Sequence, residues 1–238
     1  MAKRQFDRPM TADELMEKLR HDPEWVARER ERERERRLAE QAFRAEETPI
    51  LQDIAHAGLR INSVWDLVNA SQSYPEAIPV LMKHLPIPYH RRIREGIARA
   101  LTVKEAKGVA CRVLLEEFKK SDDPSPNGFK WALANALSVT ADQSVLDELI
   151  ELAADRSHDG ARDGIVRALA NFPGDERVVD VLIDVLSDET VAGHAVTALG
   201  KLKAKRAEPC LERFLTHPQA WVRKEAKKAI EAIRRTDR

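Results

Sequence analysis

The chain of 238 residues is poor in aromatic residues, which make up 5% of it, and it has only two cysteines. Cys111 and Cys210 lie far apart within apolar helical patterns, so we expect buried thiols in a reducing compartment and no disulfide or metal site. No apolar run reaches the roughly 18 residues that a membrane span needs. The first residues, MAKRQFDRPMTADEL, lack the apolar stretch of a signal peptide. These absences predict a cytoplasmic protein without a membrane partner.

The motifs of common catalytic and metal sites are absent as well. The seven histidines form no His-Glu-x-x-His string, and none is paired at helical metal-binding spacing with a carboxylate nearby. There is no glycine-rich phosphate loop and no Gly-x-Ser-x-Gly elbow. We therefore expect no enzymatic activity and no cofactor, and the sequence offers no small-molecule substrate site.

Charge is abundant but unevenly distributed. Charged residues make up 34% of the chain and apolar residues 43%, a composition typical of helical proteins when aromatics are scarce. The net charge is zero, yet residues 141–190 hold four basic and thirteen acidic residues, and residues 191–238 hold twelve basic and five acidic ones. A dipolar chain of this kind attracts charged partners at either end. The alternative is that these charges are solvated helix faces.

A nine-residue unit recurs along the chain and determines the predicted fold. Successive copies start 36, 32, 30 and 31 residues apart, and position 8 of the unit is alanine in each of them. Self-similarity at this period is typical of stacked repeats. The copies are IREGIARAL from Ile93, FKWALANAL from Phe129, ARDGIVRAL from Ala161, VAGHAVTAL from Val191 and VRKEAKKAI from Val222.

Each copy follows a second apolar helical segment, and a turn rich in Pro, Asp, Ser or Gly separates the two. We call the first segment of each pair the A helix and the nine-residue unit the B helix. Such a helical hairpin cannot close its own core, so the hairpins should stack into one solenoid. The predicted hairpins are residues 75–103, 104–140, 141–173, 174–202 and 203–238. A capping pair at 48–74 should precede them and bury Leu51, Ile54, Val64, Leu67 and Val68.

Residues 1–47 should form a charged helical arm outside the solenoid. Thr11 and Glu14 form a capping-box pair at the start of a short helix. Asp22 before Pro23 then predicts a longer helix that ends near Glu47, with a new helix starting at Thr48-Pro49. From Arg28 to Arg36 basic and acidic residues alternate strictly, which favours a solvent-exposed helix over a coiled coil.

The pattern of an apolar A helix followed by Val-Arg, Ala and Ala-Leu resembles HEAT repeats, and specifically the short bacterial units also seen in phycobilisome lyases. The clearest copy is AWVRKEAKKAIEAI at Ala220–Ile233, and HAVTALGKL at His194–Leu202 is the next. The resemblance covers about Pro75 to Arg235. It implies an all-α fold, a right-handed α-α superhelix of the HEAT/armadillo type, in which the B helices line the concave surface.

The resemblance makes the exposed B-helix positions the candidate partner-binding face. Position 2 of the unit is basic in four copies and position 7 in three, and Trp131 occupies position 3. Basic residues beside an aromatic would bind phosphates or an acidic peptide. For position 2 the resemblance also implies a structural alternative, pairing with an acid of a nearby turn such as Asp123, Asp159 or Asp188. The candidates are Arg94, Arg99, Lys130, Trp131, Arg162, Arg167, Arg223 and Lys228.

The acidic residues between 141 and 190 lie mostly at polar positions of A helices, where we expect a solvated outer face. We therefore expect a non-enzymatic scaffold or adaptor that binds another protein on its concave surface, a role that suits stacked helices. One alternative is binding of a nucleic-acid backbone along the basic row, with steep salt dependence. The other is an enzyme subunit of the bilin-lyase type, which the repeat type alone suggests.

Overall fold

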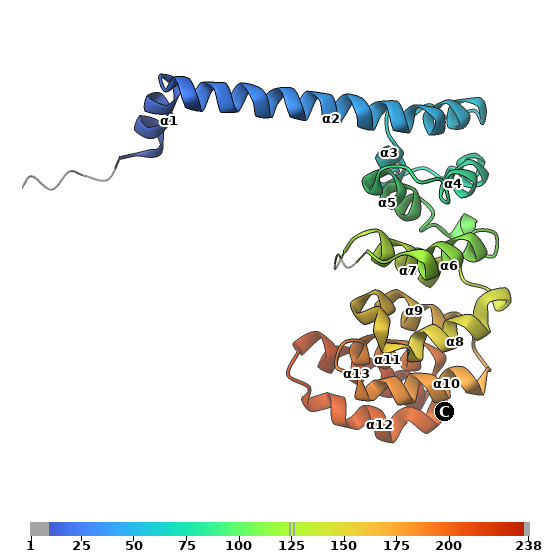
Figure 1. The fold of residues 1–238 in the computed structure, drawn as a ribbon. Coiled ribbons are helices and arrows are strands. Elements are labelled where there is room, and N and C mark those ends of the chain that lie inside the picture. Colours follow the sequence, from blue (N-terminus) through green and yellow to red (C-terminus); the bar gives the residue numbers. More distant parts are fainter. Residues whose placement is uncertain (1–9, 124, 126, 236–238) are drawn as a thin grey trace, which may run out of the picture. The chain divides into compact units, whose positions relative to one another are not determined.

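The computed structural model describes residues 10–123, 125 and 127–235, and within these ranges all regular structure is helical (Figure 1). This confirms the predicted all-α class. The chain divides into two compact units, Met1–Glu46 and Glu47–Arg238, and each is described by itself.

The first unit contains α1 (Ala12–Arg20) and most of α2 (Pro23–His56). The predicted capping box is present, with the Glu14 amide donating to Thr11 and the Thr11 amide to the Glu14 carboxylate at 3.0 Å. The Asp22 carboxylate accepts from the first amides of α2. The alternating charges of α2 form i,i+3 pairs such as Arg32 with Glu29 at 3.6 Å. These pairs are exposed, so each stabilises the helix by only a few tenths of a kcal/mol.

The predicted break before Pro49 is wrong, because α2 continues without interruption to His56. Proline removes one backbone hydrogen bond from a helix interior. Here the helix continues because Glu47, Ile50 and Ile54 present one buried face to the second unit's core. The buried face of this helix also differs from the predicted one. Leu51 was expected in the core, but it is only half-buried, and Ile50 is fully buried instead.

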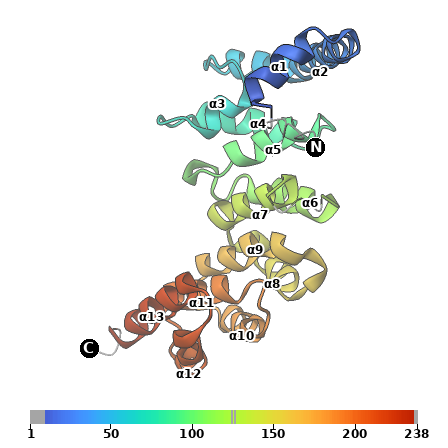
Figure 2. The ribbon, with the colours of Figure 1, turned by 90° about the vertical axis from the view of Figure 1, so that its left-hand side faces the viewer.

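The second unit is built from two layers of helices (Figure 2). The B layer starts with α3, which Ser63 caps, and the A layer starts with α4. The B helices are α3 (Val64–Val68), α5 (Arg91–Ala100), α7 (Phe129–Thr140), α9 (Arg162–Ala168), α11 (Ala192–Leu202) and α13 (Ala220–Arg234). The A helices are α4 (Ile78–His84), α6 (Cys111–Lys120), α8 (Leu146–Ala154), α10 (Glu176–Asp184) and α12 (Glu208–Glu212).

The core lies where the two layers meet and where neighbouring B helices stack. Positions 1, 5, 8 and 9 of the nine-residue unit are buried in each copy, apart from half-buried Ala161. Small residues let the B helices approach closely. A Cβ on Gly164 would lie 2.7 Å from the Asn135 backbone nitrogen, and one on Gly200 would lie 2.6 Å from the Ala229 Cβ. These distances are too short for real contacts, so only glycine fits.

The two layers are spaced differently along the stack. Each B helix from α3 to α13 packs directly against the next one, whereas extensive contact between successive A helices is confined to α8 and α10. The B helices are therefore the more continuously packed layer of the second unit. We call the exposed side of the B layer the inner face and the exposed side of the A layer the outer face.

Candidate partner-binding surface

The basic residues at position 2 are bonded within the chain. Arg94 pairs with the buried carboxylate of Glu117 at 2.5 Å and stacks over the Phe129 ring at 4.3 Å. Arg223 donates from Nη1 to the backbone oxygens of His217 and Pro218, at 2.7 and 2.8 Å. These bonds join the start of a B helix to the A helix of the next hairpin, as in Arg94, or to the turn before it, as in Arg223. They support the structural alternative for position 2.

Arg162 is the clearest case of a structural arginine. Its side chain is buried, pairs with Asp188, and donates from Nη1 to the Ala153 carbonyl at 3.0 Å. We therefore remove Arg162 from the binding surface. Asp188 was one of its three expected partners. Asp123, another of those three, pairs with Arg91 at 3.1 Å instead of with a position-2 residue.

Lys130, the position-2 residue of α7, is half-buried, with its ammonium 5.3 Å from the centre of the Phe118 ring. Trp131, expected as an exposed aromatic, is also half-buried. The guanidinium of Arg99 lies over the Trp131 ring, 5.2 Å from its centre. A cation over an aromatic face is attractive and holds both groups in place.

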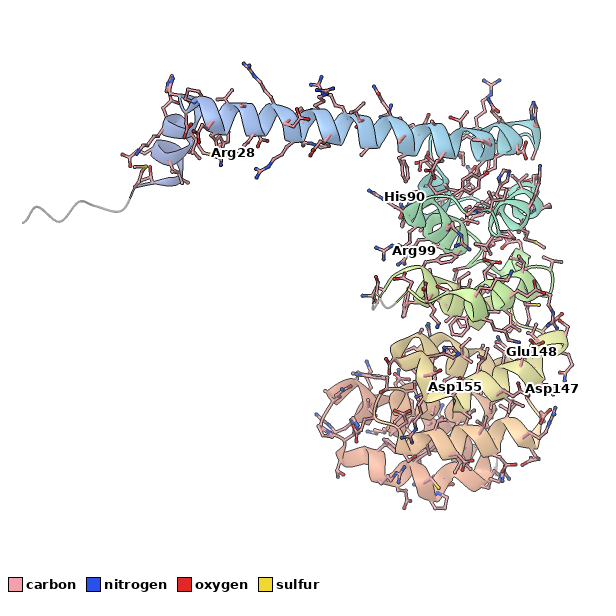
Figure 3. The ribbon with its side chains drawn as sticks, in the orientation of Figure 1. Arg28, His90, Arg99, Asp147, Glu148 and Asp155 are labelled. Carbon is pink, nitrogen blue, oxygen red and sulfur yellow. The ribbon has the colours of Figure 1, made fainter. Side chains whose placement is uncertain are left out.

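Arg99, at position 7 of α5, lies on the B-helix side of the ribbon (Figure 3). Its Nη2 contacts the Glu95 carboxylate at 2.8 Å and donates to the Asn127 carbonyl at 2.9 Å. Its side chain is 25% exposed. The guanidinium is therefore positioned in advance by a carboxylate, a carbonyl and an aromatic ring, and it still reaches the surface.

Arg167, at position 7 of α9, has a different environment. Its Nη2 donates to the Asn135 side-chain oxygen at 2.8 Å, and its Nε donates to the Asp163 carbonyl at 3.3 Å. Within the described part of the chain, no carboxylate lies at ion-pair distance from this guanidinium. Burial lowers the pKa of Arg167, and the nearby charge of Asp163 opposes that shift only in part. The side chain is thus a half-desolvated cation whose own partners are neutral oxygens.

Two amides on this face are not among the basic and aromatic candidates. Asn135 bridges α7 and α9 through its bond to Arg167, and Asn171 donates to the Ser138 carbonyl at 3.1 Å. Asn135 occupies position 7, so a search of that column for any hydrogen-bonding residue would have found it. On α11, the Nε2 atom of His194 lies 3.4 Å from the Asp163 carboxylate. The His194 ring also packs against the Trp221 ring, with 5.3 Å between their centroids.

The last B helix, α13, carries several exposed charged side chains. Lys228 is 58% exposed and pairs with Glu225 of its own helix at 2.7 Å. The indole of Trp221 is 44% exposed on the same helix. Arg223, Lys224 and Lys227 are exposed beside them.

The acidic residues of the outer face have partners in neighbouring hairpins. Glu148 on α8 pairs with Arg112 and Lys119 of α6, and the two cations lower the pKa of its carboxyl. Asp147 pairs with Arg177 of α10 at 2.8 Å. Figure 3 shows Asp147 and Glu148 together on α8. The outer face is therefore solvated, as expected from the sequence, and several of its acidic residues also form ion pairs between repeats.

No helix among the described residues is long and apolar enough to cross a membrane. No group of three or more His, Cys, Asp or Glu residues among them is arranged to hold a metal ion.

Comparison with known proteins gives the family of the C-terminal repeats. Residues 179–238 match the family model of HEAT repeats. A designed armadillo repeat protein is 20% identical, with 71% of this chain and 91% of that chain covered and a TM-score of 0.47. An engineered protein is 22% identical, with 72% and 89% covered and a TM-score of 0.49. No curated protein matches the sequence. Residues 179–238 are therefore similar to HEAT repeats, and the earlier hairpins of the second unit stack in the same two-layer arrangement.

Proposed function

We propose that the chain is a non-enzymatic scaffold that binds another protein on the B-helix face of its second unit. A repeat solenoid of this type is typical of protein-interaction modules. The observation that carries the proposal is the row of position-7 residues on α5, α7 and α9. Arg99, Asn135 and Arg167 reach this face from three successive B helices, and Trp131 lies among them.

The charges on this face favour a protein over a nucleic acid. Glu95 lies beside Arg99, and Asp163 lies one helical turn from Arg167. A nucleic-acid backbone carries a negative charge at every nucleotide, so it is bound by an unbroken run of cations, and these two carboxylates interrupt such a run. A protein partner presents charges of both signs and hydrogen-bonding groups, which a mixed face of this kind complements.

The test is capture of partners from native lysate by the tagged chain, with and without nuclease. The binding-face variant is Arg99→Glu with Arg167→Gln. The control is Arg60→Glu with Lys107→Glu, two exposed residues in loops outside the B-helix row. We expect a stoichiometric protein that survives nuclease and is retained by the control but lost by the binding-face variant. Thermal melts of both variants verify that each is folded. Equal capture by the two variants would contradict the proposal.

A second candidate is binding of a nucleic-acid backbone, which the exposed basic residues of α13 favour. Lys224, Lys227 and Lys228 are exposed on the same helix as the exposed Trp221, and a base could stack on that ring. In this case the captured material disappears on nuclease treatment. Affinity for a labelled oligonucleotide would also fall steeply as salt is raised.

A further inference from the structure

We propose that Arg99, Trp131, Asn135 and Arg167 recognise the carboxylates of an extended, acidic segment of the partner. The inference rests on the proposed function and deepens it by naming the chemistry of the partner. It starts from a difference among the arginines of the B helices. Arg94 and Arg162 pair with carboxylates of other segments, and Arg99 pairs with Glu95 of its own helix, whereas Arg167 has no carboxylate at ion-pair distance among the described residues.

Arg167 has the donors to bind a carboxylate in addition to its present contacts. A guanidinium carries five N–H donors, and its planar fork matches the two oxygens of a carboxylate. The bonds to Asn135 and Asp163 use Nη2 and Nε, and Nη1 donates to no acceptor among the described residues. Since the group is already half-desolvated, a partner carboxylate would meet a cation that has lost part of its hydration. Such a charge-assisted pair is stronger than one formed in full solvent.

The neighbours of Arg167 suit an extended chain. The Asn135 oxygen accepts from Arg167, so the amide nitrogen of Asn135 is left to donate to a carbonyl or carboxylate. Trp131 lies one turn before Asn135 on the same face of α7, where the Arg99 guanidinium covers it. Backbone carbonyls of a bound strand would accept hydrogen bonds from the Asn135 amide. Its acidic side chains would pair with Arg99 and Arg167.

The spacing of the arginines specifies the partner further. Arg99 lies on α5 and Arg167 on α9, two B helices further along the stack. Packed helices are about 8–10 Å apart, so the two guanidinium groups, two helix spacings apart, are separated by roughly 16–20 Å. An extended chain advances about 3.3 Å per residue, and it covers that distance in about five or six residues. We therefore expect two acidic residues about five or six positions apart in the partner segment.

The probe is a fluorescein-labelled peptide with two glutamates six positions apart in a Gly/Ser/Ala background. Its matched comparator has glutamine at both positions, and a labelled oligo-dT represents nucleic acid. We expect the glutamate peptide to bind the wild-type chain about tenfold or more tightly than the glutamine peptide, as measured by anisotropy. Arg167→Lys should lose most of that preference, because an ammonium cannot form the bidentate contact.

Asn135→Asp gives the sharpest test. The new carboxylate would take the place of the amide oxygen 2.8 Å from the Arg167 nitrogen and would supply the missing anion from within the chain. We expect this variant to unfold at a higher urea concentration than wild type and to lose its preference for the glutamate peptide. The control is Gln143→Glu, an amide-to-acid change at an exposed position of the A-helix layer. It should retain the preference.

Equal binding of the two peptides to wild type would overturn the inference, and so would full glutamate preference in Asn135→Asp. Tighter binding of oligo-dT than of the glutamate peptide would also overturn it, in favour of nucleic acid. These outcomes leave the proposed function standing if the captured protein still depends on Arg99 and Arg167. Loss of that dependence would instead refute the proposed function itself.

Discussion

At the scale of single residues, the spacing of the B helices depends on side chains that are small or missing. The alanine at position 8 is buried in each copy of the nine-residue unit. Gly164 is more restrictive, because its α-carbon faces the backbone of Ala134 and Asn135 on α7. A neighbouring backbone cannot move aside as a flexible side chain can, so this contact tolerates no Cβ.

We expect Gly164→Ala to lower the free energy of unfolding by about 1–3 kcal/mol through overpacking. Gly160→Ala is the matched control, since a Cβ at Gly160 meets nothing within 4 Å. Urea denaturation of both variants gives the comparison. An unchanged midpoint for Gly164→Ala would show that α7 and α9 can separate without cost.

His158 should make stability depend on pH. Burial is the main cause that lowers its pKa, and the charge of Lys130 adds to the effect. The unfolded chain, with a histidine pKa of about 6.5, then binds more protons than the folded one, so stability falls as pH drops below that value. We expect His158→Gln to lose less stability than wild type between about pH 7.5 and 5.5. The control His56→Gln alters an exposed histidine and should keep the wild-type pH profile.

At the scale of elements, one helix can supply the cap of another. Glu47 of α2 is 3% exposed, and its Oε1 accepts from both the Ser63 hydroxyl and the Val64 amide at 2.8 Å. Together with the local capping box of Ser63 and Asp66, it satisfies the first donors of α3. The start of the B layer is therefore held by a residue sixteen positions earlier in the chain.

Glu47→Gln should destabilise the second unit by about 1–3 kcal/mol, because a neutral amide is a weaker acceptor for these buried donors. Glu35→Gln removes an exposed charge from the same helix and should leave the melting temperature nearly unchanged. Equal melting temperatures for the two variants would argue against the capping role.

At the scale of the whole molecule, the net charge is zero, but the charged residues of the two faces make different kinds of contact. Acidic residues of the outer face pair with cations of adjacent hairpins, as Glu148 does with Arg112 and Lys119. On the inner face, Arg167 instead contacts an amide and a backbone carbonyl, and Arg99 adds a carbonyl and an aromatic ring to its pair with Glu95 of the same helix. The acidic block in the sequence thus stabilises contacts between repeats, and the inner face remains available to a partner.

Truncation should show where the folded unit begins. A chain that starts at residue 44 keeps Glu47 and the buried Ile50 and Ile54, and it should retain the cooperative melt of the full chain. A chain that starts at residue 48 loses the Glu47 cap and should melt at a lower temperature. Identical melts for the two truncated chains would contradict this boundary.

The repeat itself was predictable, because burial follows the 3.6-residue period of a helix. The nine-residue columns predicted nearly every core position of the B helices, and the caps at Thr11 and Asp22 followed from local chemistry. The break at Pro49 was predicted wrongly, since a local preference against proline was outweighed by burial of Ile50 and Ile54.

The sequence by itself therefore determined the helices, their buried faces and their stacking, because these depend on neighbours a few residues apart and on a repeated pattern. Only the tertiary structure decided which cations remain available on the inner face. Arg162 and Arg167 lie five residues apart on one helix, and sequence alone treats both as candidates. Asp188, twenty-six residues from Arg162, neutralises it, whereas the neighbouring hairpin brings only an amide, Asn135, to Arg167. Contacts between hairpins, which no local pattern encodes, made this distinction.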